Sequence, residues 1–98
     1  MIKIYILEGC DKCKKLKSTL DKLKLEYECT VCEENPNDCD RIEAATGVDM
    51  YPIVYSKGSL LYVAESYKDI GKKKMLNENL SSLGFYSIDN IIEFIKKD

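Results

Sequence analysis

Two cysteines separated by two residues, Cys10 and Cys13, are the first groups in the sequence that could carry out chemistry. Thiols at this spacing can exchange with a disulfide: one attacks as a thiolate, and the other then displaces the product. The same spacing also occurs in zinc sites, where two thiolates bind one metal ion. The elements around the pair distinguish these two interpretations.

The cysteine pair lies where a predicted strand changes into a predicted helix. Residues 2–7 alternate isoleucine with other side chains, which predicts a strand. From 11 to 25, apolar residues recur every three or four positions among lysines, which predicts an amphipathic helix. The first N–H groups of a helix lack intrahelical acceptors and favour a nearby thiolate. We therefore expect Cys10 to attack and Cys13, on the buried face of the helix, to resolve the mixed disulfide.

The charged residues next to the two cysteines have opposite effects on the stability of a thiolate. Lys12 lies between the two cysteines and favours a thiolate, whereas Asp11 beside it opposes one. Because of this position we also place Asp11 and Lys12 among the substrate-binding residues. The sequence contains no histidine, so an imidazole base and a mixed cysteine–histidine zinc site are both excluded.

The next segments continue the alternation of strand and helix. Residues 26–32 alternate again and predict a second strand. Asn35 and Pro36 are typical of a helix start, and Gly47 is suited to end that helix in a left-handed conformation.

The C-terminal half predicts a β-hairpin and a last helix. Apolar runs on either side of residues 56–59 predict the hairpin, and Ser87 is a suitable cap for the helix. Three consecutive lysines within residues 67–83 suggest an exposed helical stretch. The order β-α-β-α-β-β-α predicts an α/β fold in which a four-stranded mixed sheet has helices on both faces. We expect residues 1–98 to form a single domain.

A proline directly precedes the first hairpin strand, where it cannot donate a ladder hydrogen bond. A cis bond between Tyr51 and Pro52 is one way to accommodate it. A strand ending in CxxC, a helix, and a proline at the head of a hairpin strand resemble the thioredoxin superfamily. Only about 40 residues separate Cys10 from Pro52. This interval is similar to glutaredoxins, including the small glutaredoxin-like reductants of ribonucleotide reductase.

The resemblance covers residues 1–66 and implies a thioredoxin-like fold with thiol–disulfide oxidoreductase activity. It implies that Pro52 is the cis-proline beside the active site and that the Tyr51 backbone pairs with the substrate segment. The implied partners are disulfide-containing proteins, ribonucleotide reductase among them, and either glutathione or a flavin-dependent reductase as electron donor. No tightly bound cofactor is required, and glutathione would act as a co-substrate.

The sequence departs from glutaredoxins where those proteins bind glutathione. The usual features are Pro-Tyr between the cysteines, a lysine shortly before them, Thr-Val before the proline, and Gly-Gly followed by aspartate. This chain has instead Asp11-Lys12, Leu7-Glu8-Gly9, Met50-Tyr51 and residues 63–66, Val-Ala-Glu-Ser. These differences concern the glutathione site and leave dithiol exchange intact.

The main alternative is a zinc-binding interaction module. Its four ligands would be Cys10, Cys13, Cys29 and Cys32, which have the C-x2-C-x15-C-x2-C spacing of a four-cysteine site. However, Cys29 and Cys32 are three residues apart on a predicted strand and therefore point to opposite faces. An iron–sulfur cluster shared between subunits with glutathione is a third interpretation, because Asp11 rather than proline follows the first cysteine.

The remaining cysteines have simpler expected roles. We expect Cys29 and Cys39 to be buried as small apolar side chains and Cys32 to be exposed at a strand end. A Cys32–Cys39 disulfide is compatible with the sequence, but no pattern in the sequence favours it.

Composition excludes several other classes of protein. The 98 residues carry a net charge of −2 and contain no basic stripe of the kind that binds nucleic acid. No apolar run approaches the roughly 20 residues of a membrane span, and none has the form of a signal peptide. We therefore expect a cytoplasmic monomer with neither a nucleic-acid nor a membrane partner.

Overall fold

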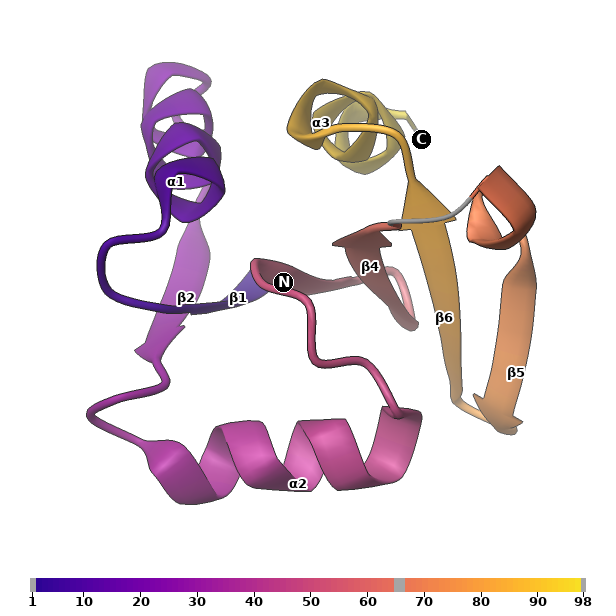
Figure 1. Cartoon of the computed structure of the whole chain (residues 1–98). Coiled ribbons are helices and arrows are strands. Elements are labelled where there is room, and N and C mark those ends of the chain that lie inside the picture. Colours follow the sequence, from indigo (N-terminus) through magenta and orange to yellow (C-terminus); the bar gives the residue numbers. More distant parts are fainter. Residues whose placement is uncertain (1, 65–66, 98) are drawn as a thin grey trace.

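The computed structural model describes residues 2–64 and 67–97. Its elements in chain order are β1 (Ile2–Ile6), α1 (Asp11–Lys22), β2 (Tyr27–Val31), α2 (Pro36–Thr46), β3 (Ile53–Ser56), β4 (Ser59–Val63), the short 3-10 helix η1 (Tyr67–Asp69), β5 (Lys73–Asn77), β6 (Leu80–Phe85) and α3 (Ile88–Lys96). Within these described residues, six strands form one mixed sheet in the order β2-β1-β3-β4-β6-β5 (Figure 1). No helix in the described ranges is long and apolar enough to cross a bilayer.

The first half of the chain follows the sequence-based expectations closely. β1 and β2 are parallel and joined by α1, and β3 lies antiparallel to β1 on its other side. Gly47, with φ of 72°, ends α2 in the left-handed conformation as predicted, because a residue without Cβ adopts it at little cost. β3 and β4 form the predicted hairpin, and the Ser87 hydroxyl caps α3. The helix expected over residues 11–25 ends at Lys22.

The expectation of a four-stranded sheet is wrong, because residues 73–85 form two additional strands. β6 lies parallel to β4, and β5 pairs antiparallel with β6 at the edge of the sheet. The lysines that suggested a helix lie at the start of this edge strand, where exposed charged side chains also discourage pairing with other chains. Exposed lysines therefore do not distinguish a surface helix from an edge strand. A turn at Glu78 and Asn79 joins the two strands.

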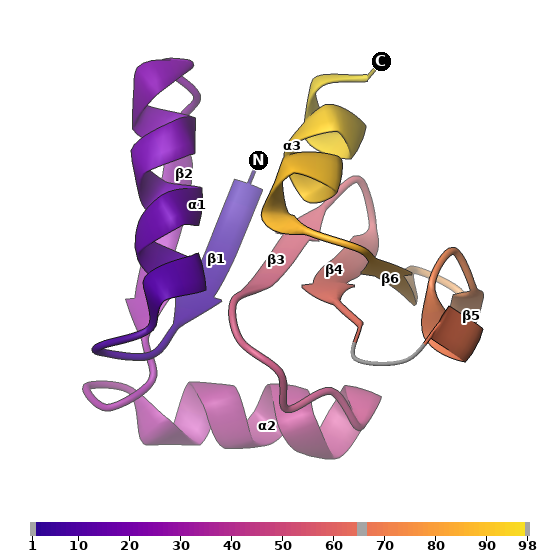
Figure 2. The same cartoon turned by 45° about the horizontal axis from the view of Figure 1, so that its top comes forward.

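Helices cover both faces of the sheet, as predicted. α1 and α3 pack side by side on one face, and α2 lies across the other (Figure 2). On the first face, the isoleucines of β1 contact Leu16 and Leu20 of α1 and Ile91 of α3. On the second face, Val48 packs with Ile53 and Leu60. This packing fixes the start of α1 at the end of β1, which is where the cysteine pair lies.

Candidate dithiol active site

Cys10 is the N-cap residue of α1. β1 ends at Ile6, and a short loop containing Gly9 in a left-handed conformation turns the chain into the helix. The Cys10 Sγ accepts a hydrogen bond from the Cys13 N–H at 3.2 Å. This sulfur has the position that a serine or aspartate oxygen usually has at a helix start. One of the unpaired N–H groups of the first turn is therefore directed at the partly exposed Cys10 thiol, where it stabilises negative charge.

Cys13 lies one turn later on the buried face of α1, where 1% of its surface is exposed. The pKa of the Cys13 thiol is raised to about 12, chiefly by burial and also by the hydrogen bond and charge of Cys10, while the Leu7 backbone acts in the opposite direction. Cys13 is therefore protonated at neutral pH. The structure thus places one accessible sulfur and one shielded sulfur at the start of the same helix.

The Tyr51–Pro52 segment lies beside this helix start. The peptide bond between these two residues is cis, as predicted, and Pro52 is fully buried. Since Tyr5 pairs with Ile53, Pro52 lies level with the end of β1. Tyr51 and Cys10 both pack against the core cluster beneath α1 and α3. Figure 2 shows the segment that leads into β3 passing close to the end of β1.

The other predicted contact residues, Asp11 and Lys12, are exposed in the first turn of α1. Both therefore lie at the surface next to Cys10. The predicted set of six residues is thus gathered at one end of the sheet. Residues 65 and 66, which belong to a segment that differs from glutaredoxins, lie outside the described residues.

A cavity of about 410 Å³ adjoins this site between the loop before Cys10 and α2. Leu7, Tyr51, Cys32 and Cys39 line it. Four acidic residues complete this side of the cavity and form what we call the acidic wall: Glu33, Asp40, Glu43 and Asp49. Sequence reasoning missed this acidic wall. The only signal for it was the excess of acidic residues between positions 33 and 49, which by itself indicates no more than a solvated surface.

Glu33 connects the acidic wall to the loop that precedes Cys10. Its carboxylate oxygens accept hydrogen bonds from the Glu8 N–H at 3.0 and 3.2 Å. Glu8 lies two residues before Cys10. The interaction therefore holds the backbone that leads into the start of α1.

The Tyr51 hydroxyl is buried and lacks a hydrogen-bond partner within the described part of the chain, although the neighbouring Glu43 carboxylate acts on it. The pKa of Tyr51 is raised to about 12, chiefly by burial and also by the neighbouring carboxylates of Glu43, Asp40 and Asp49. A buried hydroxyl without a partner is costly. It can accept or donate a hydrogen bond when a ligand enters.

The remaining cysteines correct two expectations. Cys32 is not exposed: 7% of its surface is accessible, and it forms a disulfide with Cys39, which is buried as predicted. Its N–H bonds to the Ile6 carbonyl at 2.9 Å, which continues the β1–β2 pairing and brings Cys32 to the first turn of α2. Cys29 is exposed rather than buried, because β2 is an edge strand with one side open to solvent.

The disulfide also bears on the zinc interpretation. That site needs four free thiolates, and Cys32 is bonded to Cys39. Within residues 2–64 and 67–97, no group of three or more cysteine, aspartate or glutamate side chains could hold a metal ion. The structure therefore gives the four-cysteine site no support.

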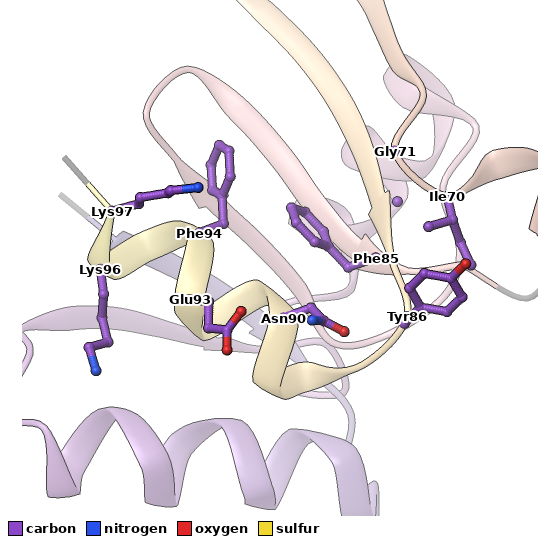
Figure 3. A pocket seen from close by; sticks show the side chains of 10 residues that line it. Ile70, Gly71, Phe85, Tyr86, Asn90, Glu93, Phe94, Lys96 and Lys97 are labelled. Atoms are coloured by element: carbon purple, nitrogen blue, oxygen red, sulfur yellow. The ribbon is translucent and has the colours of Figure 1, made fainter.

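A second cavity, of about 600 Å³, lies between β6 and α3 (Figure 3). Phe85 and Phe94 meet edge to face there, with ring centres 5.5 Å apart, and Tyr86, Asn90 and Glu93 also line it. No cysteine belongs to its described lining. This cavity is therefore separate from the cysteine pair at the start of α1.

The fold and the cysteine pair together define a thioredoxin-like α/β protein. The glutaredoxin family model matches residues 2–61, which is more than half of the chain. The chain therefore belongs to the glutaredoxin family of thiol–disulfide oxidoreductases, as expected from the sequence. The matched range contains the cysteine pair and the Tyr51–Pro52 segment and ends within β4. No curated protein matches the sequence.

Proposed function

We propose that this protein reduces disulfides by dithiol exchange, with Cys10 as the nucleophile and Cys13 as the resolving thiol. One observation carries the proposal: the partly exposed Cys10 sulfur accepts the Cys13 N–H at the start of α1, and the Cys13 thiol is buried one turn later. The helix start supplies the electrostatic stabilisation, so the reaction needs no tightly bound cofactor.

The reaction has two exchange steps. The Cys10 thiolate attacks one sulfur of the substrate disulfide, a mixed disulfide forms, and the first substrate thiolate leaves and takes a proton from water. Cys13 then loses its proton and attacks the Cys10 sulfur, which forms the Cys10–Cys13 disulfide and releases the second substrate thiolate. Two electrons and two protons have then passed to the substrate. Glutathione as co-substrate, or a flavin-dependent reductase, returns them to the protein.

The neighbouring residues would position the substrate. The Tyr51 backbone would pair with the substrate segment beside Pro52, and Asp11 and Lys12 would contact it from the first turn of α1. The substrates would be disulfide-containing proteins, with ribonucleotide reductase as one candidate. The position of Tyr51 beside the same core cluster as Cys10 supports this arrangement.

Two single substitutions test the assignment of roles. We expect Cys10→Ser to abolish disulfide reduction and Cys13→Ser to trap a mixed disulfide that intact-mass measurement detects. Cys29→Ser is the matched control, because Cys29 is a free, exposed cysteine on the edge strand. Full activity of Cys10→Ser, or a mixed disulfide trapped at Cys29, would contradict the proposal.

A further inference from the structure

The acidic cavity beside the dithiol lies where a bound substrate would extend. Leu7, three residues before Cys10, and Tyr51, directly before Pro52, both line it. A substrate segment that pairs with Tyr51 and presents a sulfur to Cys10 would therefore pass over this cavity. Side chains next to the substrate cysteine would enter it.

The charge of this cavity has one sign. Among the described residues that line it, the charged ones are carboxylates, and they come from Glu33, Asp40, Glu43 and Asp49. Arg41, the basic residue on α2, lines a different cavity, beside β1 and β2. Lys12 lies outside the lining of the acidic cavity. A like-charged array at a partly enclosed wall repels anions and concentrates cations.

The buried Tyr51 hydroxyl, which lacks a hydrogen-bond partner among the described residues, is a second feature of the same place. It is buried at the cavity wall, and the carboxylates of Asp40, Glu43 and Asp49 act on it. An ammonium or guanidinium group that enters would donate hydrogen bonds to these carboxylates and to the Tyr51 oxygen. A substrate carboxylate could accept only from the tyrosine and would meet repulsion from the rest.

We propose that this cavity selects disulfide substrates that carry positive charge next to the reacting cysteine, and that it disfavours anionic disulfides such as oxidised glutathione. The proposal rests on the dithiol function proposed above and names the substrate class of the same site. It agrees with the sequence, in which the features that bind glutathione are replaced. Glutathione carries more carboxylates than ammonium groups, so its net charge has the wrong sign for this wall.

Three small disulfides of similar length and different charge provide the test: cystamine is cationic, bis(2-hydroxyethyl) disulfide is neutral, and dithiodiglycolate is anionic. Reduced protein is mixed with each one, and formation of the Cys10–Cys13 disulfide is followed by alkylation and mass measurement. Each second-order rate constant is divided by that of dithiothreitol with the same disulfide, which corrects for the leaving thiol. We expect the corrected rate for cystamine to exceed that for dithiodiglycolate by about tenfold or more at low salt. Near 1 M salt the Debye length is about 3 Å, and the two corrected rates should converge.

Two variants of equal net charge test whether the preference for cystamine arises at the acidic wall. Asp40→Asn/Glu43→Gln/Asp49→Asn neutralises the wall and leaves Glu33 bonded to the Glu8 N–H. We expect it to lose most of the preference for cystamine. The control variant neutralises three exposed carboxylates outside the cavity, as Glu26→Gln/Glu78→Gln/Glu93→Gln, and should retain the preference.

The outcomes separate the two proposals. If the wild-type protein does not reduce the neutral disulfide, the dithiol function itself is wrong. If it reduces all three disulfides at equal corrected rates, or prefers dithiodiglycolate, the charge selection is wrong and the dithiol function stands. Should the cavity variant fail to fold, the salt dependence of the wild-type preference decides, because a preference that persists at 1 M salt would not be electrostatic.

Discussion

The Cys32–Cys39 disulfide should contribute a large part of the stability of this small protein. It joins the end of β2 to the first turn of α2 across a sequence separation of 7 residues. The chain-entropy relation gives about 2.5 kcal/mol for a loop of this size. Asn35, the N-cap of α2, makes no capping hydrogen bond through its side chain, so the disulfide is a covalent restraint at a helix start that lacks this cap.

Cys32→Ala/Cys39→Ala removes the link without burying a hydroxyl group. A loss of 1 kcal/mol shifts the thermal midpoint of a domain of this size by roughly 4–8 °C, so we expect a fall of about 10–20 °C. Calorimetry measures the midpoint, and Cys29→Ala is the control, because Cys29 is a free, exposed cysteine. Thiol titration of the unfolded wild-type protein should find two fewer reactive thiols before reduction than after it, provided that Cys10 and Cys13 are in the dithiol form. A midpoint within about 2 °C of the wild type, equivalent to less than about 0.5 kcal/mol, would refute this account.

Two further predictions concern the buried Cys13 thiol and the close packing around Gly84. Because burial raises the pKa of Cys13 from 9.0 to about 12, the folded state retains a proton that the unfolded chain has lost, and stability should fall as pH rises through that interval. Cys13→Ala should reduce the fall between pH 8 and 11 in urea titrations, and equal slopes in both proteins would contradict the assignment. Gly84→Ala should destabilise the fold by about 1–3 kcal/mol, since its Cβ would lie 2.6 Å from the Asp69 carbonyl oxygen and 2.9 Å from the Ala64 Cβ. Urea unfolding measures this loss, and an unchanged midpoint would show that η1 moves aside at no cost.

Local patterns in the sequence predicted the active-site end of the molecule well. The change of period at Cys10, the Gly47 cap at the end of α2 and the proline before β3 each act through neighbouring atoms, and each appears as predicted. These signals depend on backbone geometry within a few residues. They therefore need no knowledge of the tertiary structure.

The features that the sequence did not predict depend on tertiary neighbours. β5 is an edge strand, so its exposed lysines carry no alternation that would distinguish it from a surface helix. Cys32 meets Cys39 only because the Ile6 pairing places the end of β2 beside α2. The acidic wall likewise forms from the loop after β2, from α2 and from the segment before Tyr51, which only the folded chain brings together.

The physical cause of the raised Cys13 pKa would also order the two exchange steps of the proposed reaction. Burial is the largest cause, and the hydrogen bond and charge of Cys10 are additional ones. While Cys10 is a thiolate, its charge opposes ionisation of Cys13, so the second thiol remains protonated and does not compete for substrate. Once Cys10 is in a mixed disulfide that charge is gone, and the Leu7 backbone still favours the Cys13 thiolate. In the proposed reaction, Cys13 therefore becomes easier to ionise only after Cys10 has reacted, when its attack would release the substrate.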